Sequence, residues 1–167
     1  MPAKIISGKE MAAAIREELK LRAQKLKEKG VVAGLGVILV GEDPASVSYV
    51  TAKAKAAEEI GIFEETVRLP GDASEEEILK NVDRLNSDQR FHGVLVQLPL
   101  PKWVNPDKVI NFISPEKDVD GFHPVNVGKL LRGEPCPLPC TPYGIQQMLV
   151  RSGYSPEGQH VVICGRS

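Results

Sequence analysis

Apolar and polar residues are distributed in blocks that predict a series of strands and helices. Two short runs are almost entirely apolar, GLGVILV at 34–40 and GVLVQL at 93–98. Runs of this kind are typical of strands that are buried on both faces of a parallel sheet. Further strands are predicted at Thr66–Leu69 and, as the last element, at His160–Cys164 (HVVIC).

Capping residues mark where the predicted helices begin. Ser7 and Ser74 each stand three residues before a glutamate, which is the spacing of a capping box. Asp43, Asn105 and Thr141 each stand directly before a proline, a residue suited to the first helical position. Glycines and prolines end the helices, which we expect over about residues 8–29, 44–60, 75–85, 106–114 and 142–151.

The alternation of strands and helices predicts the fold class. Because the connections are short, we expect an α/β fold, with a three-layer domain built on a mostly parallel sheet. The segment 99–142 holds nine of the 13 prolines, so it should form loops and short helices.

Composition and charge exclude several classes of protein. The 167 residues are 42% hydrophobic and 26% charged, as in ordinary globular proteins, and suffice for one domain or one domain and part of another. The formal net charge of -1 and the few aromatic residues do not favour nucleic acid as a partner. We expect neither a secretory signal nor a membrane span, because long apolar stretches are missing.

The three cysteines indicate a reducing compartment, so we expect a cytoplasmic protein. Cys136 and Cys140 have the spacing of half a metal site. Two prolines lie between them, however, and the nearby sequence offers only His123 as a histidine ligand, so we expect no metal.

Ligands of open parallel sheets bind at the carboxyl ends of the strands. Gln97 closes an apolar strand there, and a buried glutamine needs partners, so it either holds a neighbouring loop or contacts a ligand. On the preceding helix, Ser46, Tyr49 and Lys53 share one stripe. A tyrosine can stack on a flat ligand while a lysine one turn later exchanges a proton, if its pKa is lowered. The alternative is a solvated helix face.

The position of Lys53 limits where such a site can be. Lys53 lies nine residues into the helix, roughly 13 Å from its start at a rise of 1.5 Å per residue. The flank of the helix, and not its N-terminus, would therefore line the site.

Two later segments offer further candidates. In KDVDGFHPVN (117–126), Asp118 and Asp120 could cap turns, and a buried Asp120 could instead accept hydrogen bonds from an amino-pyrimidine ring. His123 is interpreted as a residue that holds the loop. The final residues, Gly165-Arg166-Ser167, could bind a phosphate, although no complete nucleotide-binding motif accompanies them.

Five blocks, in one order, resemble the family of bifunctional methylenetetrahydrofolate dehydrogenases/methenyltetrahydrofolate cyclohydrolases. They are VGEDPASVSYVTAKAKAAEEIGI (40–62), GVLVQLPLP (93–101), KDVDGFHPVNVGKL (117–130), PCTPYG (139–144) and the final GRS. The resemblance implies that residues 1–140 form a folate-binding catalytic domain. Residues 141–158 would be a linking helix and crossover, and 159–167 the first strand of a truncated NADP-binding Rossmann-type domain.

The resemblance also implies a role for each candidate residue. The catalytic residues would be Lys53, Tyr49, Gln97 and Asp120. Together with Leu98 and Pro99 they would bind the substrate. Tyr49 would stack on the aromatic part of the folate, and Asp120 would bind the pterin ring. Gly165, Arg166 and Ser167 match the start of a loop that contacts the NADP 2′-phosphate, with NAD as the alternative.

The implied reaction has two steps in one pocket. A hydride passes from 5,10-methylenetetrahydrofolate to NADP+, and water then opens the methenyl product to 10-formyltetrahydrofolate. The first step needs alignment, and the second needs proton transfers that suit a lysine. Lys55 or another lysine at the cleft edge would meet the anionic glutamate tail of the folate.

The sequence stops inside the implied nucleotide loop. We therefore expect no dehydrogenase activity and at most weak cyclohydrolase activity from residues 1–167 alone, and a homodimer only for the full-length protein, through the missing domain. Two other hypotheses stay open, a folate-binding module without catalysis and a purely structural domain. Decay of methenyl absorbance, measured beside a calorimetric folate titration, distinguishes the three.

Overall fold

The computed structural model describes residues 5–165. The three strands in this part of the chain are β1 (Gly34–Val40), β2 (Phe63–Leu69) and β3 (Gly93–Val96). The six helices found there are α1 (Gly8–Lys27), α2 (Pro44–Ile60), α3 (Glu75–Ser87), α4 (Pro106–Phe112), α5 (Pro124–Leu131) and α6 (Cys140–Arg151). The alternation of strands and helices confirms the predicted α/β class.

The strands form one parallel sheet in the order β2-β1-β3. On one side β1 pairs with β2 from Gly34 opposite Phe63 onwards, and on the other it pairs with β3 from Leu35 opposite Gly93. Because β1 is the central strand, both neighbours satisfy its backbone hydrogen bonds. All but one residue of β1 are buried, as its apolar sequence predicts.

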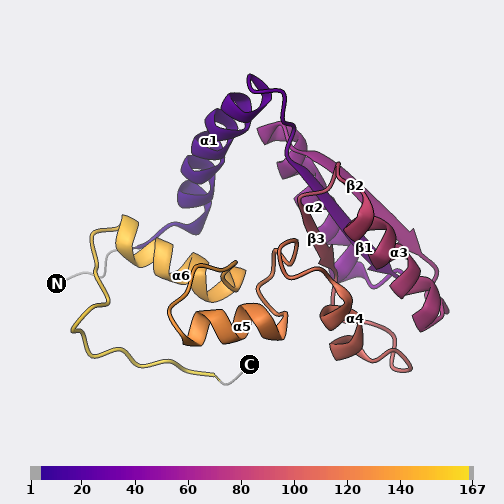
Figure 1. The fold of residues 1–167 in the computed structure, drawn as a ribbon. Coiled ribbons are helices and arrows are strands. Elements are labelled where there is room, and N and C mark those ends of the chain that lie inside the picture. Colours follow the sequence, from indigo (N-terminus) through magenta and orange to yellow (C-terminus); the bar gives the residue numbers. More distant parts are fainter. Residues whose placement is uncertain (1–4, 166–167) are drawn as a thin grey trace.

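Helices cover both faces of the sheet (Figure 1). Val37 and Leu39 of β1 pack with Val50 of α2 on one face. Ile38 and Val40 point to the other face, into a larger core that includes residues of α3 and α4. The three-layer arrangement is therefore confirmed, and the period of two along β1 divides its side chains between the two cores.

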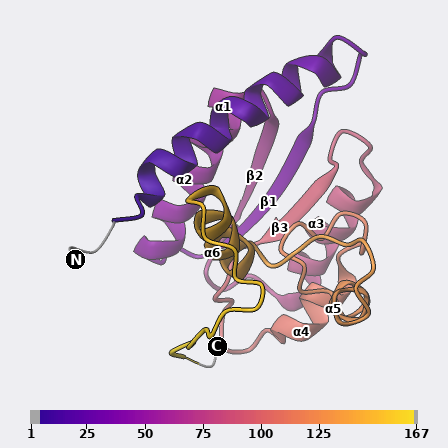
Figure 2. The same ribbon diagram turned by 90° about the vertical axis from the view of Figure 1, so that its left-hand side faces the viewer.

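Three of the described helices, α1, α5 and α6, lie outside these three layers (Figure 1). α1 packs against α2, and in Figure 2 it lies in front of that helix. Arg151 of α6 binds Glu18 of α1 through two hydrogen bonds of 2.6 and 2.9 Å. None of the described helices is long and apolar enough to cross a membrane.

The strand predicted at residues 160–164 is not formed, so this expectation was wrong. The segment is neither helix nor strand, and Val162 and Ile163 are 74% and 85% exposed. A strand needs a neighbour for its backbone hydrogen bonds, and among residues 5–165 no strand pairs with this segment. The start of a second domain at residue 159 stays a prediction, because the described residues show only that this segment is unpaired.

Smaller differences concern the ends of elements and one helix. β2 begins at Phe63, earlier than predicted, and β3 ends at Val96, before Gln97. The sequence did not predict α5, whose first residue is Pro124. His123 Nδ1 accepts a hydrogen bond from the Val125 backbone N–H at 3.1 Å, which confirms that His123 holds this segment.

Candidate functional site

A cavity of about 450 Å³ lies at the carboxyl end of β3. Its walls are the flank of α2, the end of β3 with the two residues that follow it, part of the segment 119–122, and residues 139–142 at the start of α6. It is thus located where ligands of parallel sheets bind.

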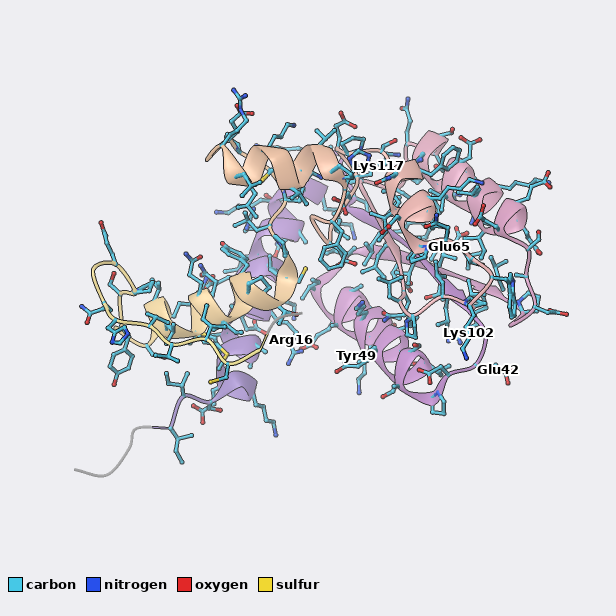
Figure 3. The ribbon with its side chains drawn as sticks, turned by 90° about the horizontal axis from the view of Figure 1, so that it is seen from below. Arg16, Glu42, Tyr49, Glu65, Lys102 and Lys117 are labelled. Carbon is cyan, nitrogen blue, oxygen red and sulfur yellow. The ribbon has the colours of Figure 1, made fainter. Side chains whose placement is uncertain are left out.

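The local sequence of α2 determines which of its side chains reach this cavity. Asp43 accepts a hydrogen bond from the Ser46 backbone N–H at 2.8 Å and so fixes the start of the helix. Ser46 and Val50 are buried against the sheet, so Ser46 does not share the cavity face as its spacing had indicated. Tyr49 is 65% exposed and, with Lys53, lines the cavity; Figure 3 shows Tyr49 on the side of α2 turned towards α6.

Lys53 and Gln97 are joined directly. Lys53 Nζ donates a hydrogen bond to Gln97 Oε1 at 3.0 Å. Gln97 is itself held by its backbone, because its N–H donates to Ile38 O at 2.9 Å and its side-chain Nε2 donates to Leu98 O at 2.7 Å. Gln97 therefore braces the adjacent backbone, as the first alternative predicted, and its contact with a ligand stays a prediction.

Asp120 faces the same cavity from a different segment. Its carboxyl is half-buried, and burial raises its pKa above the ordinary value. The positive charge of Lys53 acts in the opposite direction, whereas the negative charge of Asp118 adds to the rise. The cavity thus combines an amine, an amide and a carboxyl group.

Cys140, the first residue of α6, lies beside Asp120. Its Sγ is 3.8 Å from Asp120 Oδ1 and 3.6 Å from the Val119 carbonyl oxygen, so the thiol can donate to either acceptor. Burial raises the pKa of the Cys140 thiol, and the nearby Asp120 charge raises it further. These effects keep the thiol protonated and able to donate.

Gly121 explains how the two loops meet. Its φ of +68° belongs to the region that favours glycine. A Cβ at this position would lie 2.8 Å from the Pro137 carbonyl oxygen and 3.0 Å from the Pro139 nitrogen. The absence of a side chain therefore lets residues 137–139 pass over the loop and bring Cys140 to Asp120.

Several predicted site residues lie elsewhere. Leu98 lines the cavity, but Pro99, joined to Leu98 by a cis peptide bond, is exposed and does not. Lys55 is exposed and borders a different surface hollow, with Glu58. Gly165 is exposed with a φ of +132°, while Arg166 and Ser167 lie outside the described residues.

Other cavity residues were not predicted as parts of this site. Phe122, Cys140 and the prolines at 139 and 142 line the cavity. In the sequence Cys140 was considered only as half of a metal site, which its surroundings did not favour. No group of three or more His, Cys, Asp or Glu side chains that could hold a metal occurs within residues 5–165. The prolines of segment 137–139, which passes over Gly121, were the sequence signal that could have indicated this wall of the cavity.

A second hollow, of about 480 Å³, lies away from this cavity and includes Phe63, Arg90 and His92. Arg90 lies over the Phe63 ring at 5.6 Å and binds Asp88, whose pKa it lowers to about 2. Its cation is therefore already paired, and the hollow lacks a carboxyl and lysine combination like that of the first cavity.

Comparison with known proteins was made for the whole chain. Residues 6–120 match the family model of the tetrahydrofolate dehydrogenase/cyclohydrolase catalytic domain. Bifunctional protein FolD of Geotalea daltonii is 53% identical over 165 residues, which cover 99% of this chain and 59% of that protein. The FolD protein of Dehalococcoides mccartyi strain 195 is 54% identical over 168 residues, which cover 100% of this chain and 57% of that protein. The chain thus spans less than two thirds of these relatives.

Solved structures give the same result. The crystal structure of FolD from Campylobacter jejuni superposes with a TM-score of 0.88 at 46% identity, over 90% of this chain and 54% of that one. The Trypanosoma brucei methylenetetrahydrofolate dehydrogenase-cyclohydrolase, solved with NADP and an inhibitor, has a TM-score of 0.87 at 37% identity. That match covers 92% of this chain and 53% of the other.

Proposed function

The chain belongs to the tetrahydrofolate dehydrogenase/cyclohydrolase family, and on this basis we propose that its cavity binds a tetrahydrofolate for catalysis. The whole enzyme would oxidise 5,10-methylenetetrahydrofolate to the methenyl form with NADP+ and hydrolyse that product to 10-formyltetrahydrofolate. The observation that carries the proposal is the Lys53–Gln97 hydrogen bond in a cavity that also holds Asp120.

The cavity suits the flat, polar head of a folate. Its volume of about 450 Å³ falls in the range of small-molecule sites. Asp120 offers two carboxylate oxygens, which can accept hydrogen bonds from the paired N–H groups of an amino-pyrimidine. The exposed ring of Tyr49 is available to stack on the aromatic part of the ligand.

In the oxidation step the residues of this chain would hold the folate so that its methylene carbon is aligned for transfer. NADP+, when bound, would accept the hydride. The residues proposed to hold it are Gly165, Arg166 and Ser167, which match the start of the loop that contacts the NADP 2′-phosphate in the family.

In the hydrolysis step a water molecule attacks the amidinium carbon and loses a proton. The bond from that carbon to the departing ring nitrogen then breaks, and the nitrogen gains a proton. Lys53 would carry the proton between these atoms, because its Nζ lies in the cavity and is oriented by Gln97. Asp120 would keep the pterin ring in place meanwhile.

Replacement of Lys53 tests the proposal. In the full-length enzyme we expect Lys53→Met to abolish the decay of methenyltetrahydrofolate absorbance above buffer, while calorimetric folate affinity changes by less than about tenfold. Lys80→Met is the control, since Lys80 is exposed on α3 and outside the cavity, and it should change neither quantity.

The controls also separate the alternatives. Unchanged hydrolysis by Lys53→Met would remove Lys53 from its role. Folate binding by the full-length wild-type protein without decay above buffer would indicate a binding module. A folded wild-type chain that binds no folate would indicate a structural domain.

Domain division and assembly are part of the same proposal. Residues 1–140 would form the folate domain, 141–158 the linking helix and crossover, and 159–167 the start of the nucleotide domain. The full-length protein would act in the cytoplasm, where its cysteines stay reduced. It would form a homodimer through the region that the relatives have and this chain does not span.

A further inference from the structure

A buried polar pair lies directly behind the Asp120 segment. Asp118 and Asn126 are only 2% and 1% exposed. Asn126 Nδ2 donates to Asp118 Oδ2 at 2.9 Å and to the Pro115 carbonyl oxygen at 2.8 Å. The backbone N–H of His123 donates to the same Oδ2 at 2.9 Å.

Burial makes a charge on Asp118 costly, and within the described residues no lysine or arginine forms a salt bridge with it. The cost of burying this charge is offset by two N–H donors, His123 N and Asn126 Nδ2. The N-terminus of α5 also offsets it, because Asn126 lies in the first turn of that helix. A buried polar pair of this kind adds little net stability, because the cost of removing its groups from water offsets their attraction. Its main effect is to specify a single backbone path.

The path specified is the short loop that carries Asp120. Lys117, which precedes the loop, is held at two points. Its carbonyl oxygen accepts a hydrogen bond from Val94 N of β3 at 2.7 Å. Its Nζ donates to three carbonyl oxygens at the end of α3 (Figure 3). On the far side of the loop, His123 N returns to the Asp118 carboxylate. Residues 119–122 are therefore closed into a loop, with Asp120 directed into the cavity.

We propose that Asp118 and Asn126 are positioning residues that hold residues 119–122 closed and so keep the Asp120 carboxylate beside Lys53. The consequence for folate binding rests on the function proposed above. The placement of Asp120, however, is measurable without any folate.

Three charged or titratable groups face Asp120. They are Lys53 from α2, Asp118 from its own segment and Cys140 from α6. Burial and Asp118 raise the pKa of Asp120, and Lys53 lowers it. Asp118→Asn keeps the shape and the acceptor oxygen but removes the charge, so the pKa of Asp120 should fall. Asn126→Ala instead removes the donor that holds the carboxylate and leaves Pro115 O without its partner.

The experiment uses the chain labelled for NMR, in the wild type and both variants, with Asp107→Asn as a control at an exposed carboxyl. The titration midpoint of the Asp120 carboxyl and the amide exchange of His123 are measured first. In Asp118→Asn the midpoint should fall while exchange stays within about threefold; in Asn126→Ala exchange should rise by about tenfold or more. Tetrahydrofolate affinity is then measured against pH, and its acid limb should move with the Asp120 midpoint.

Each outcome decides the proposal. Unchanged His123 exchange in folded Asn126→Ala overturns it, as does an Asp120 midpoint that Asn126→Ala leaves at the wild-type value. If Asn126→Ala fails to fold, Asn126→Ser, which shortens the side chain but stays polar, is judged by the same two readouts. If the wild type binds no tetrahydrofolate, the proposed function fails, while the two folate-free measurements still judge the positioning role.

Discussion

Asp120 shows, at the scale of a single residue, that a group suited to ligand binding can lower the stability of the fold. Since burial raises its pKa above the unfolded value, folding favours its protonated form. Stability from this group is fully present below the unfolded pKa of about 3.8 and is lost as pH rises through the folded pKa. A ligand that donates N–H groups needs the ionised form, so the residue is most useful where it stabilises least.

Asp120→Asn should therefore be more stable than the wild type at pH 7.5, and this difference should shrink towards pH 3.5. The same variant should lose about ten- to a hundredfold in tetrahydrofolate affinity, because a charge-assisted acceptor is gone. Urea unfolding at both pH values and calorimetric titration measure the two effects. A variant less stable than the wild type at pH 7.5 would contradict the argument.

The sequence predicted some of these residues because their signals are local. Tyr49 and Lys53 follow from helical spacing, and Gln97 from its polarity at the end of a strand. Local sequence patterns could not indicate which of Asp118 and Asp120 would be buried behind the loop and which would face the cavity, and only the family resemblance pointed to Asp120. That difference depends on Asn126, on α5 and on the contacts of Gly121, which come from other segments.

At the scale of elements, several helix starts were predictable for the same reason, but Thr141, expected to precede the last helix, is the second residue of α6. Asp43 and Ser74 each accept a hydrogen bond from a backbone N–H three residues later, a contact that nearby sequence encodes. The strand at 160–164 was predicted wrongly because pairing depends on a distant partner, which an apolar run does not supply. α5 was missed because a histidine, an unusual capping residue, precedes its first proline.

The crossing of loops at Gly121 gives a prediction at this scale. Gly121→Ala should destabilise the chain by at least about 1–2 kcal/mol, from its positive φ alone, and should displace the start of α6 from the cavity. Gly128→Ala is the matched control within α5. No atom lies within 4 Å of its added Cβ, so it should stabilise by about 0.5–1 kcal/mol. Urea denaturation measures both, and equal effects would exclude a special role for the crossing.

At the scale of the whole molecule, burial is uneven. β1 is almost wholly buried, whereas no residue of α1 or α6, as the structure describes these two helices, is buried. The chain thus has a firm sheet and a looser periphery joined by contacts such as Arg151–Glu18.

Hydrogen exchange should reveal this division. Amides of β1 should exchange only through global unfolding, and those of α1 and α6 through local opening, at least about a hundredfold faster. Urea should raise exchange steeply in β1 and weakly in the two helices. Equal protection throughout would show that the periphery is as firmly held as the sheet.

The strand order β2-β1-β3 also implies an order of events in folding. β1, α2 and β2 form one continuous stretch, 34–69, and can assemble by closing short loops. β3 joins β1 only after α3 has crossed the sheet, so we expect the stretch 34–69 to be the folding nucleus and β3 to dock last. Lys53 belongs to that nucleus, but Gln97 follows the strand that arrives last. A folding intermediate that lacks only β3 would therefore retain two of the three described strands and none of the Lys53–Gln97 contact, so this contact would report the final folding step.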